Sequence, residues 1–210
     1  MTTEKVTESI QCWEDIKRGL KNRGNIEALQ KANKIDRLYS QDSSGKDILH
    51  FLAIYASPFS FELVIKSIEE KCPKDFSGNT PLHTATKYGK TEIAKIILDE
   101  VEDKNPKNKS KLTPLHYAVI NGHYETVKLI LNNVLEKNPE DEFGNTPLHF
   151  AAQKKYLDIA KLIAAVVKDK NPKNKFDQTP FDLIDLETLV SAEDIENWCH
   201  LFGKEKLGFL

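Results

Sequence analysis

The sequence of 210 residues is 30% charged and carries a formal net charge of −2, so no global field favours nucleic acid or an anionic membrane surface. No apolar run approaches the ~20 residues that cross a bilayer, and the polar N-terminus leads into no signal-peptide core, so neither membrane insertion nor secretion is expected. Three scattered cysteines (Cys12, Cys72, Cys199) indicate a reducing compartment, and we expect a cytoplasmic protein, with the nucleus as the alternative.

The chain is organised around a tetrapeptide, Thr-Pro-Leu-His, that recurs every 33 residues. Intact copies begin at Thr80, Thr113 and Thr146, and degraded copies begin at Asp47 and Thr179. Five units in one register predict a stack of like modules, because each module alone is too small to bury its apolar face.

Each copy is expected to begin a helix in the same way. Its Thr is a good N-cap, its Pro suits the first helical position, and its Leu begins a buried stripe. Its His, at the third helical position, can bond to the cap or to a neighbouring module. In the copy beginning at Thr113, we expect Leu115 to be buried and the preceding Leu112 to be exposed.

The residues around each tetrapeptide repeat as well. An Asp and a Gly spaced as in a tight turn precede it, as in Asp75 to Gly78, and a glycine such as Gly89 follows the short helix at a position suited to a left-handed backbone. A second apolar column, Ile93, Ile96 and Ile97, has the i, i+3, i+4 spacing of one helix face. The unit is therefore predicted to be a turn, a short helix, a bend and a longer helix.

With this 33-residue period and Thr-Pro-Leu-His signature, the sequence resembles the ankyrin repeat family over nearly its whole length. The resemblance implies an all-α-dominated repeat solenoid in which each unit is a β-hairpin turn followed by an antiparallel helix pair. Valines stand where the family has a glycine after the second helix, and lysine or aspartate replaces the glycine of some turns and of one bend. These departures predict less ideal turns at Val101, Val134, Val167, Lys111, Lys155 and Asp177.

We expect one ankyrin-repeat domain over residues 1–210, of about five repeats. An N-terminal capping helix pair is predicted over 9–36, where Ile10, Trp13 and Leu20 have helical spacing. The repeats are then predicted at 37–69, 70–102, 103–135 and 136–168. A C-terminal capping repeat follows at 169–203, in which Ser191 begins a final helix, and 204–210 form a tail.

The sequence carries no sign of catalysis, of a metal site or of a cofactor. Four histidines recur one per unit, too far apart to share a metal ion with bonds of ~2.0–2.1 Å, and the resemblance implies that they bond within and between repeats. Phosphate-binding loops, zinc-protease motifs and nucleophile elbows are absent. The structural motif comprises Thr80, His83, Thr113, His116, Thr146 and His149, with His50 in the first unit.

The resemblance also implies where a partner protein binds, because partners of the family usually contact the hairpin tips and the inner face of the first helices. Several of these positions are aromatic. Because turns lie on the surface, an aromatic residue in a turn contributes little to the core. By register, the partner-binding residues are Tyr55, Phe76, Asn79, Lys87, Tyr88, Lys109, Leu112, Ile120, Asn121, Glu142, Phe143, Asn145, Gln153, Lys154, Phe176 and Gln178.

The function favoured by the resemblance is a non-catalytic protein–protein interaction module, an adaptor or scaffold that is expected to be a monomer. An inhibitor that masks a single target protein is the alternative within the binding class. Nucleic-acid binding and an enzyme's substrate platform are less favoured. Lysine-rich tips are interrupted by an acidic one, no aromatic platform for bases is evident, and no segment is left over for a catalytic domain.

Three asparagines occupy the hairpin position that an asparaginyl hydroxylase modifies in other ankyrin proteins: Asn105, Asn138 and Asn171. Each has an acidic residue two positions before it and an isoleucine eight positions before it. Pro follows each of them, however, and by making the loop entry rigid it offers a structural explanation for the same pattern.

Overall fold

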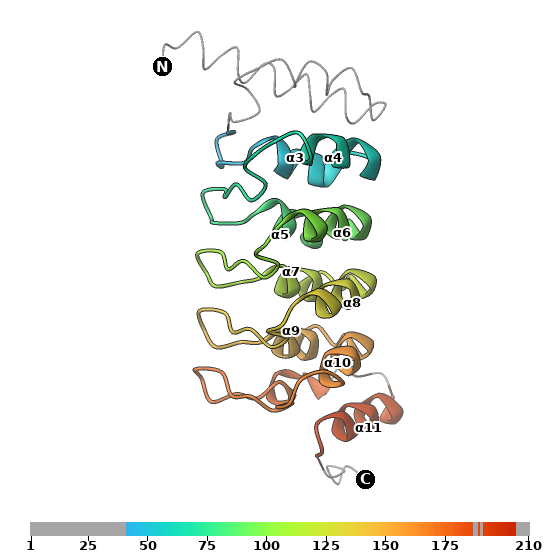
Figure 1. The fold of residues 1–210 in the computed structure, drawn as a ribbon. Helices are drawn as coiled ribbons and strands as arrows, with labels where there is room; N and C mark the ends of the chain where they lie inside the picture. The colour runs from blue at the N-terminus through green and yellow to red at the C-terminus, as the bar shows by residue number, and fades with distance from the viewer. Residues whose placement is uncertain (1–40, 187–188, 190, 205–210) are drawn as a thin grey trace. The chain divides into compact units, whose positions relative to one another are not determined.

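The computed structural model describes residues 41–186, 189 and 191–204. Within these residues the chain forms nine α-helices and one 3-10 helix (Figure 1). In chain order they are α3 (Ile48–Tyr55), α4 (Pro58–Ile65), α5 (Pro81–Lys87), α6 (Thr91–Glu100), α7 (Pro114–Ile120), α8 (Tyr124–Asn133), α9 (Pro147–Gln153), α10 (Leu157–Ala164), η1 (Phe181–Leu183) and α11 (Ala192–Leu201).

The tetrapeptide begins three of these helices as predicted. Thr80, Thr113 and Thr146 are the N-caps of α5, α7 and α9, and a proline occupies the first helical position of each. In the first repeat Asp47 replaces the threonine, and its carboxylate accepts the backbone N–H of His50 at the start of α3. The 33-residue period of the sequence therefore marks where the first helix of each repeat begins.

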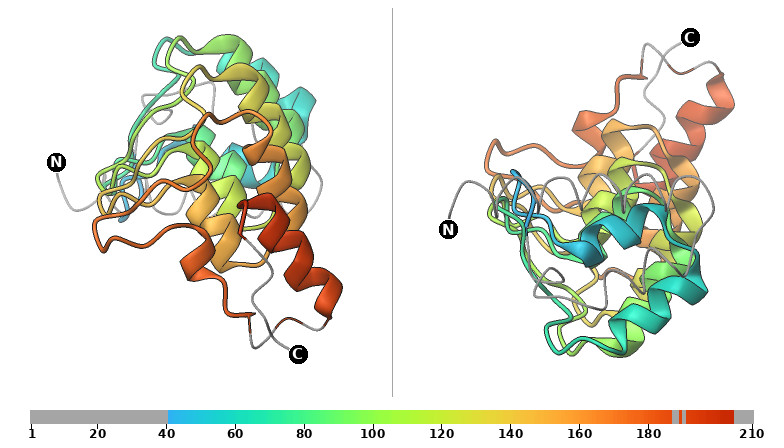
Figure 2. Two further views of the ribbon diagram at one scale, coloured as in Figure 1. Left: turned by 90° about the horizontal axis from the view of Figure 1, so that it is seen from below. Right: turned by 90° about the horizontal axis from the view of Figure 1, so that it is seen from above.

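The chain divides into two compact units, Met1–Lys109 and Ser110–Leu210. In the first unit, α3 packs against α4 and α5, and α6 packs against α4 and α5. Its core includes Leu52, Phe61, Leu82 and Ile97, which are almost fully buried. The turns that precede α3 and α5 project to the same side of these helices (Figures 1 and 2).

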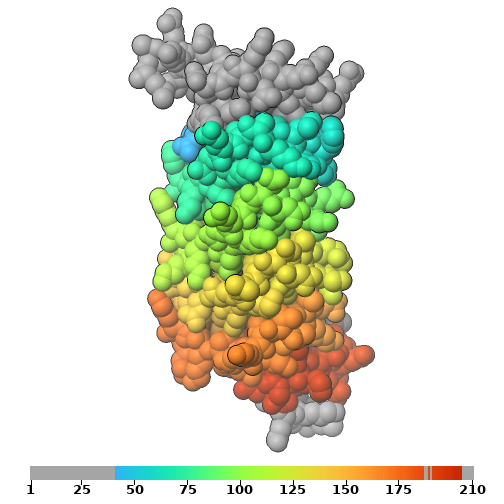
Figure 3. Space-filling view, viewed as in Figure 1, coloured from blue at the N-terminus to red at the C-terminus, as the bar shows by residue number. Residues whose placement is uncertain are grey.

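In the second unit, α7 packs against α8 and α9, and α10 packs against α8, α9 and α11. Leu115, Ile130 and Leu148 are fully buried between the helices. On the face shown in Figure 3, atoms of the α9–α10 segment lie directly against those of the segment that contains η1. The expected burial of Leu115 is confirmed.

The buried face of the longer helices differs from the predicted column. Ile93 and Ile97 are buried, but Ile96 is only half-buried, and the remaining buried positions of α6 are Ala94 and Leu98. The same shift occurs in α8 and α10, where Leu129 and Leu162 are half-buried. The reason is that these helices have more than one neighbour: α6 packs against α5 and α4, and α10 packs against α9 and α8, so two adjacent rows of side chains are covered.

The expected β-hairpins are reduced to tight turns, and no strand occurs within the described residues. The second turn is closed by two bonds, from Asp75 N to Asn79 O (2.9 Å) and from Gly78 N to Asp75 O (2.8 Å). A single backbone bond then joins it to the turn before it, from Phe76 N to Ser44 O (3.0 Å). The arms are too short for a ladder, although the helical repeat itself is confirmed.

The residues that stand in place of glycine adopt the left-handed conformation that glycine favours. Lys111, Lys155 and Asp177 have φ values of 58°, 59° and 63°, in the left-handed region that is costly for residues with a Cβ atom. The prediction of less ideal turns is confirmed at these three positions. Val101 and Val134 end α6 and α8 in extended conformation, so these helices have no left-handed cap.

The first helix of the last repeat is shorter than in the others. It is only η1, and the final helix, α11, begins after Ser191, whose hydroxyl accepts the backbone N–H of Asp194 at 3.1 Å. Trp198, Cys199 and Phe202 are buried, whereas Ile195 of the same helix is only half-buried. The predicted N-terminal cap (9–36) and residues 205–210 of the predicted tail lie outside the described residues.

Candidate functional site

The repeated histidines bind the stack together and are not exposed for chemistry. In α9, His149 Nδ1 accepts the backbone N–H of Thr146 at 3.1 Å, so its Nε2 carries the proton and donates to Gln178 O at 3.1 Å. His116 bonds in the same way to Thr113 and Asn145. Burial lowers the pKa of His149, because the charged imidazolium would be poorly solvated there.

In the first repeat, the equivalent histidine pairs with an aspartate in place of the threonine. His50 Nδ1 lies 2.7 Å from Asp47 Oδ1, and its Nε2 lies 2.9 Å from Asn79 O. Both ring nitrogens thus face oxygen acceptors, and both can donate only when the imidazole is protonated. The pair is buried and holds α3 to the second turn, which is a structural role.

Three of the predicted contact residues are partly engaged in an amide network between turns. Asn108 Nδ2 donates to Asn79 Oδ1 at 2.8 Å in the first unit. In the second unit Asn174 Nδ2 donates to Asn145 Oδ1 at 2.8 Å and to Gln178 Oε1 at 3.3 Å. These amides fix the spacing of successive turns, which leaves fewer of their hydrogen-bonding groups for a partner.

The aromatic residues of the first unit stand on its surface. Phe76 is 61% exposed, although its ring leans over Gly45, where an added Cβ would come within 2.4 Å of the ring. Tyr88 follows α5 and is 46% exposed, with the ammonium of Lys87 5.9 Å from its ring centroid. Tyr55, at the end of α3, is partly exposed as well.

The second unit brings two predicted aromatics together. Phe143 of the fourth turn (Asp141–Gly144) and Phe176 of the fifth turn (Asn174–Asp177) stack with ring centroids 6.3 Å apart and an interplanar angle of 27°. A backbone bond from Lys175 N to Phe143 O, at 2.9 Å, holds the two turns side by side. Even when stacked, the rings remain 48% and 65% exposed.

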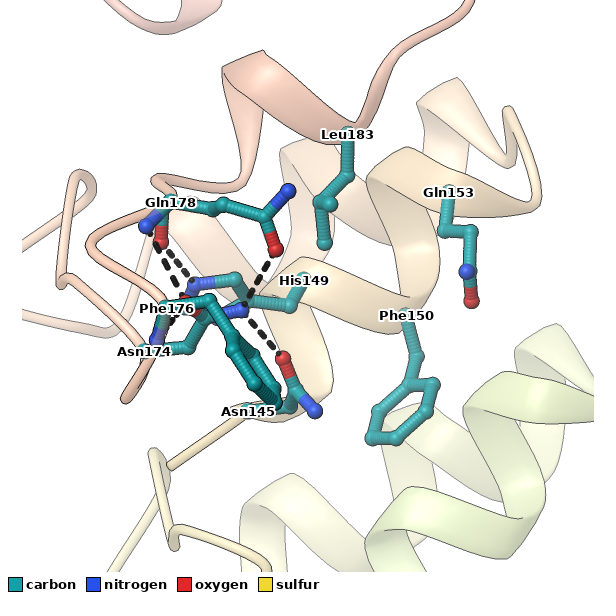
Figure 4. A pocket seen from close by; sticks show the side chains of 8 residues that line it. All are labelled: Asn145, His149, Phe150, Gln153, Asn174, Phe176, Gln178 and Leu183. Atoms are coloured by element: carbon teal, nitrogen blue, oxygen red, sulfur yellow. Dashed lines mark hydrogen bonds between the residues drawn. The ribbon is translucent and has the colours of Figure 1, made fainter. Parts of the chain in front are cut away.

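Beside this pair lies a hollow of about 160 Å³ between α9 and the fifth turn. The bonded amides and Phe176 form one side, Phe150 and Gln153 of α9 form the other, and Leu183 of η1 reaches between them (Figure 4). The hollow is lined by Asn145, His149, Phe150, Gln153, Asn174, Phe176, Gln178 and Leu183, none of which is acidic or a lysine or arginine.

Sequence reasoning found part of this hollow and missed the rest. Phe150, Asn174 and Leu183 were not among the predicted contact residues. Phe150 follows the histidine of its tetrapeptide, where the other intact copies have Thr84 and Tyr117, so the variability of that position was the available signal.

The remaining predicted contact residues do not form one cluster with the hollow. Leu112, expected to be exposed, is half-buried, as is Ile120 at the end of α7, because each packs against its neighbours. Asn121 is exposed, and its amide donates to Tyr117 O at 2.8 Å. The exposed residues Lys109, Glu142 and Lys154 complete the set.

The candidate hydroxylation sites differ in accessibility. Asn171 is exposed, whereas Asn105 and Asn138 are half-buried. The acidic residue two positions earlier has a structural use, since Asp103 Oδ1 accepts Asn105 N–H at 3.0 Å and Asp169 Oδ1 accepts Asn171 N–H at 2.8 Å. Loop geometry thus accounts for the acidic residue at Asn105 and Asn171, and modification stays a prediction.

The described residues contain neither a cluster suited to a metal ion nor a helix suited to a membrane. No group of three or more His, Cys, Asp or Glu side chains there is arranged to hold a metal ion. No helix of the described part is long and apolar enough to cross a bilayer.

Comparison with known proteins agrees with the repeat geometry. A family model described as Ankyrin repeats (3 copies) matches residues 19–108 and 97–174, whereas no curated protein matches the chain. Repeats of this family generally mediate protein–protein interaction and are typically non-catalytic. The match spans well over half of the sequence and includes all three intact tetrapeptides, and the chain therefore belongs to the ankyrin repeat family.

Proposed function

We propose that the chain is a non-catalytic interaction module, an adaptor or scaffold, that binds another protein through its turn tips and the inner face of its first helices. The observation that supports this most directly is the exposed aromatic pair, Phe143 and Phe176, next to the uncharged hollow. The two rings remain 48% and 65% exposed even when stacked, so much of their apolar area is open to a partner.

The energetics of interfaces favour this assignment. Aromatic residues are enriched in interface cores and at the positions that contribute most to affinity. A ring held in place by a neighbouring ring loses little conformational entropy on binding, because its rotamer is already restricted. The first unit has an exposed aromatic residue of its own, Tyr88, with Lys87 beside it.

The test compares stability with capture of a partner. Tyr88→Ala combined with Phe143→Ala should leave the melting temperature nearly unchanged, since both side chains are about half exposed. Capture of the natural partner, identified by mass spectrometry after affinity purification from the native cell, should weaken by about 2 kcal/mol or more. Tyr124→Ala is the matched control, because this partly exposed tyrosine lies on α8, away from the hollow.

Two outcomes would count against the proposal. If the double variant unfolds, the rings belong to the scaffold. If it binds normally while Tyr124→Ala weakens capture, the partner uses the longer helices.

A further inference from the structure

We infer that the fourth and fifth turns bind an extended peptide segment in which an apolar, uncharged side chain lies between a basic residue and an acidic residue. This inference rests on the proposed binding function and specifies its partner. The apolar side chain enters the hollow beside α9, the basic residue faces Glu142, and the acidic residue faces Lys175.

The size of the hollow argues for a single side chain as its occupant. Its volume is about 160 Å³, well below the ≈ 300–1,000 Å³ of pockets that enclose small molecules or cofactors. Phe150 and Leu183 supply apolar surface inside an otherwise largely polar lining, and the Phe176 ring lies at the rim. An aliphatic or aromatic side chain would therefore be desolvated there.

The polar lining suits a peptide backbone. Gln153 is exposed at the end of α9 and makes no hydrogen bond within the described residues. Gln178 accepts a bond at Oε1, and its Nε2 makes none in the same part of the chain. A primary amide both donates and accepts, so it matches the N–H and C=O groups of an extended segment.

The residues that directly precede the two stacked rings carry opposite charges. Glu142 and Lys175 occupy the same position of successive turns, and both side chains are exposed. Their backbones are fixed, because Glu142 N donates to Ser110 O at 3.0 Å and Lys175 N donates to Phe143 O at 2.9 Å. Neither side chain makes an ion pair within the described residues, so both charges are available to a partner.

Of the two flanking charges, Glu140 reinforces this order, whereas the charge of Lys173 is compensated by an ion pair. Glu140 is exposed near the fourth turn, and Lys173 is exposed near the fifth turn, where it pairs with Asp177 at 2.9 Å. A partner with a single sign of charge would be attracted by one turn and repelled by the next. A peptide with a basic residue on one side and an acidic residue on the other meets complementary charge at both turns, which sets its direction.

The experiment uses the full chain and a phage-displayed library of random peptides of about 12 residues, which extend to about 40 Å. We expect enrichment of peptides with one central apolar residue, basic residues on one side and acidic residues on the other. The affinity of a synthetic copy is then measured by fluorescence anisotropy. The charge-swapped chain, Glu142→Lys with Lys175→Glu, should bind it about tenfold more weakly.

A copy of the peptide with its charges exchanged should recover the lost affinity on the swapped chain. The matched control is Glu125→Lys with Lys128→Glu, an exposed pair of opposite charge on α8, and it should leave the affinity unchanged. Phe176→Ala should weaken binding of the original peptide to the original chain and of the exchanged peptide to the swapped chain, because it removes the rim of the hollow.

The remaining outcomes are decisive against the inference. Peptides of a single charge sign, or equal binding by the swapped chain, would overturn the charge order and leave the proposed interaction function standing. Selected peptides that are indifferent to Phe176→Ala would place binding elsewhere and count against the proposed face. Failure to enrich any peptide would exclude an extended segment as the partner, whereas capture by the aromatic face would still be decided by Tyr88→Ala with Phe143→Ala.

Discussion

At the scale of the residue, one position of the repeat isolates the cost of a left-handed backbone. The bend between the two helices of a pair is Gly122 in one repeat and Lys155 in the next, with φ values of 72° and 59°. Lys155→Gly should therefore stabilise the chain by about 0.5–1 kcal/mol, since relief of the strained backbone outweighs the added entropy of the unfolded glycine. Denaturant unfolding measures the difference.

The reciprocal change is the matched control. Gly122→Ala should destabilise, because an added Cβ would be strained at this φ and would lie about 3.0 Å from the ring of Tyr156. Should Lys155→Gly lower the stability instead, the weak ion pair of Lys155 with Asp185, at 3.8 Å, would have to contribute more than such exposed pairs usually do.

Burial of His149 gives the stability a pH dependence with a definite sign. Its pKa is lowered in the folded state by burial, so between this pKa and the ordinary value of about 6.5 the unfolded chain binds more protons. The contribution of His149 to stability is complete above pH ~6.5 and decreases as the pH falls below it. His149→Asn, which keeps an acceptor for Thr146 N–H, should flatten the decline below pH ~6.5.

Urea unfolding at a series of pH values checks this prediction. Parallel curves for the wild type and His149→Asn would mean that this imidazole does not contribute to the decline.

At the scale of the element, the sequence determined where helices begin more reliably than which of their faces are buried. Thr-Pro-Leu-His specifies a helix start by local chemistry, and Thr80, Thr113 and Thr146 all serve as N-caps. The buried face depends on neighbours that are distant in sequence. Ala94 and Leu98 are buried in α6, which packs against α4 as well as α5, and helical spacing alone did not distinguish this face from the predicted one.

The hollow was only partly predictable for the same reason. Register with the family assigned Gln153, Phe176 and Gln178 to the inner surface. Leu183 reaches the hollow only because the fifth repeat forms the short η1 in place of a complete first helix. Asn174 was obscured because its column of the repeat is usually aspartate, whose role is to close the turn.

The contrast between Leu115 and Leu112 tests the packing of α7. Leu115 is fully buried, so Leu115→Ala should cost roughly 2–5 kcal/mol. Leu112 is half-buried, so its truncation should cost about 1 kcal/mol, more than expected for an exposed side chain. Denaturant melts of the two variants give both values, and a larger loss for Leu112→Ala would show that the helix is rotated or out of register.

At the scale of the whole molecule, charge is distributed by repeat and not by face. The chain has 30 Lys and Arg residues against 32 Asp and Glu residues. Lysines 168, 170, 173 and 175 gather around the fifth turn, whereas Glu140, Asp141 and Glu142 gather around the fourth. A continuous basic strip along the stack, of the kind that follows a phosphate backbone, is therefore interrupted within the second unit.

This pattern predicts weak binding to random DNA. At ~0.15 M salt we expect no association within the 10⁻⁴–10⁻⁶ M range of proteins that bind DNA non-specifically, because few lysines can reach successive phosphates together. Fluorescence anisotropy with a labelled random duplex, over a series of salt concentrations, makes the measurement. Any residual binding at low salt should be lost in Lys170→Glu with Lys175→Glu, and retained in a control such as Lys95→Glu with Lys128→Glu, whose lysines lie on α6 and α8. The contrary result would be submicromolar binding that depends on the fifth turn, with an association constant whose logarithm falls steeply with the logarithm of the salt concentration. That result would make this tip a nucleic-acid contact and displace a protein as its partner.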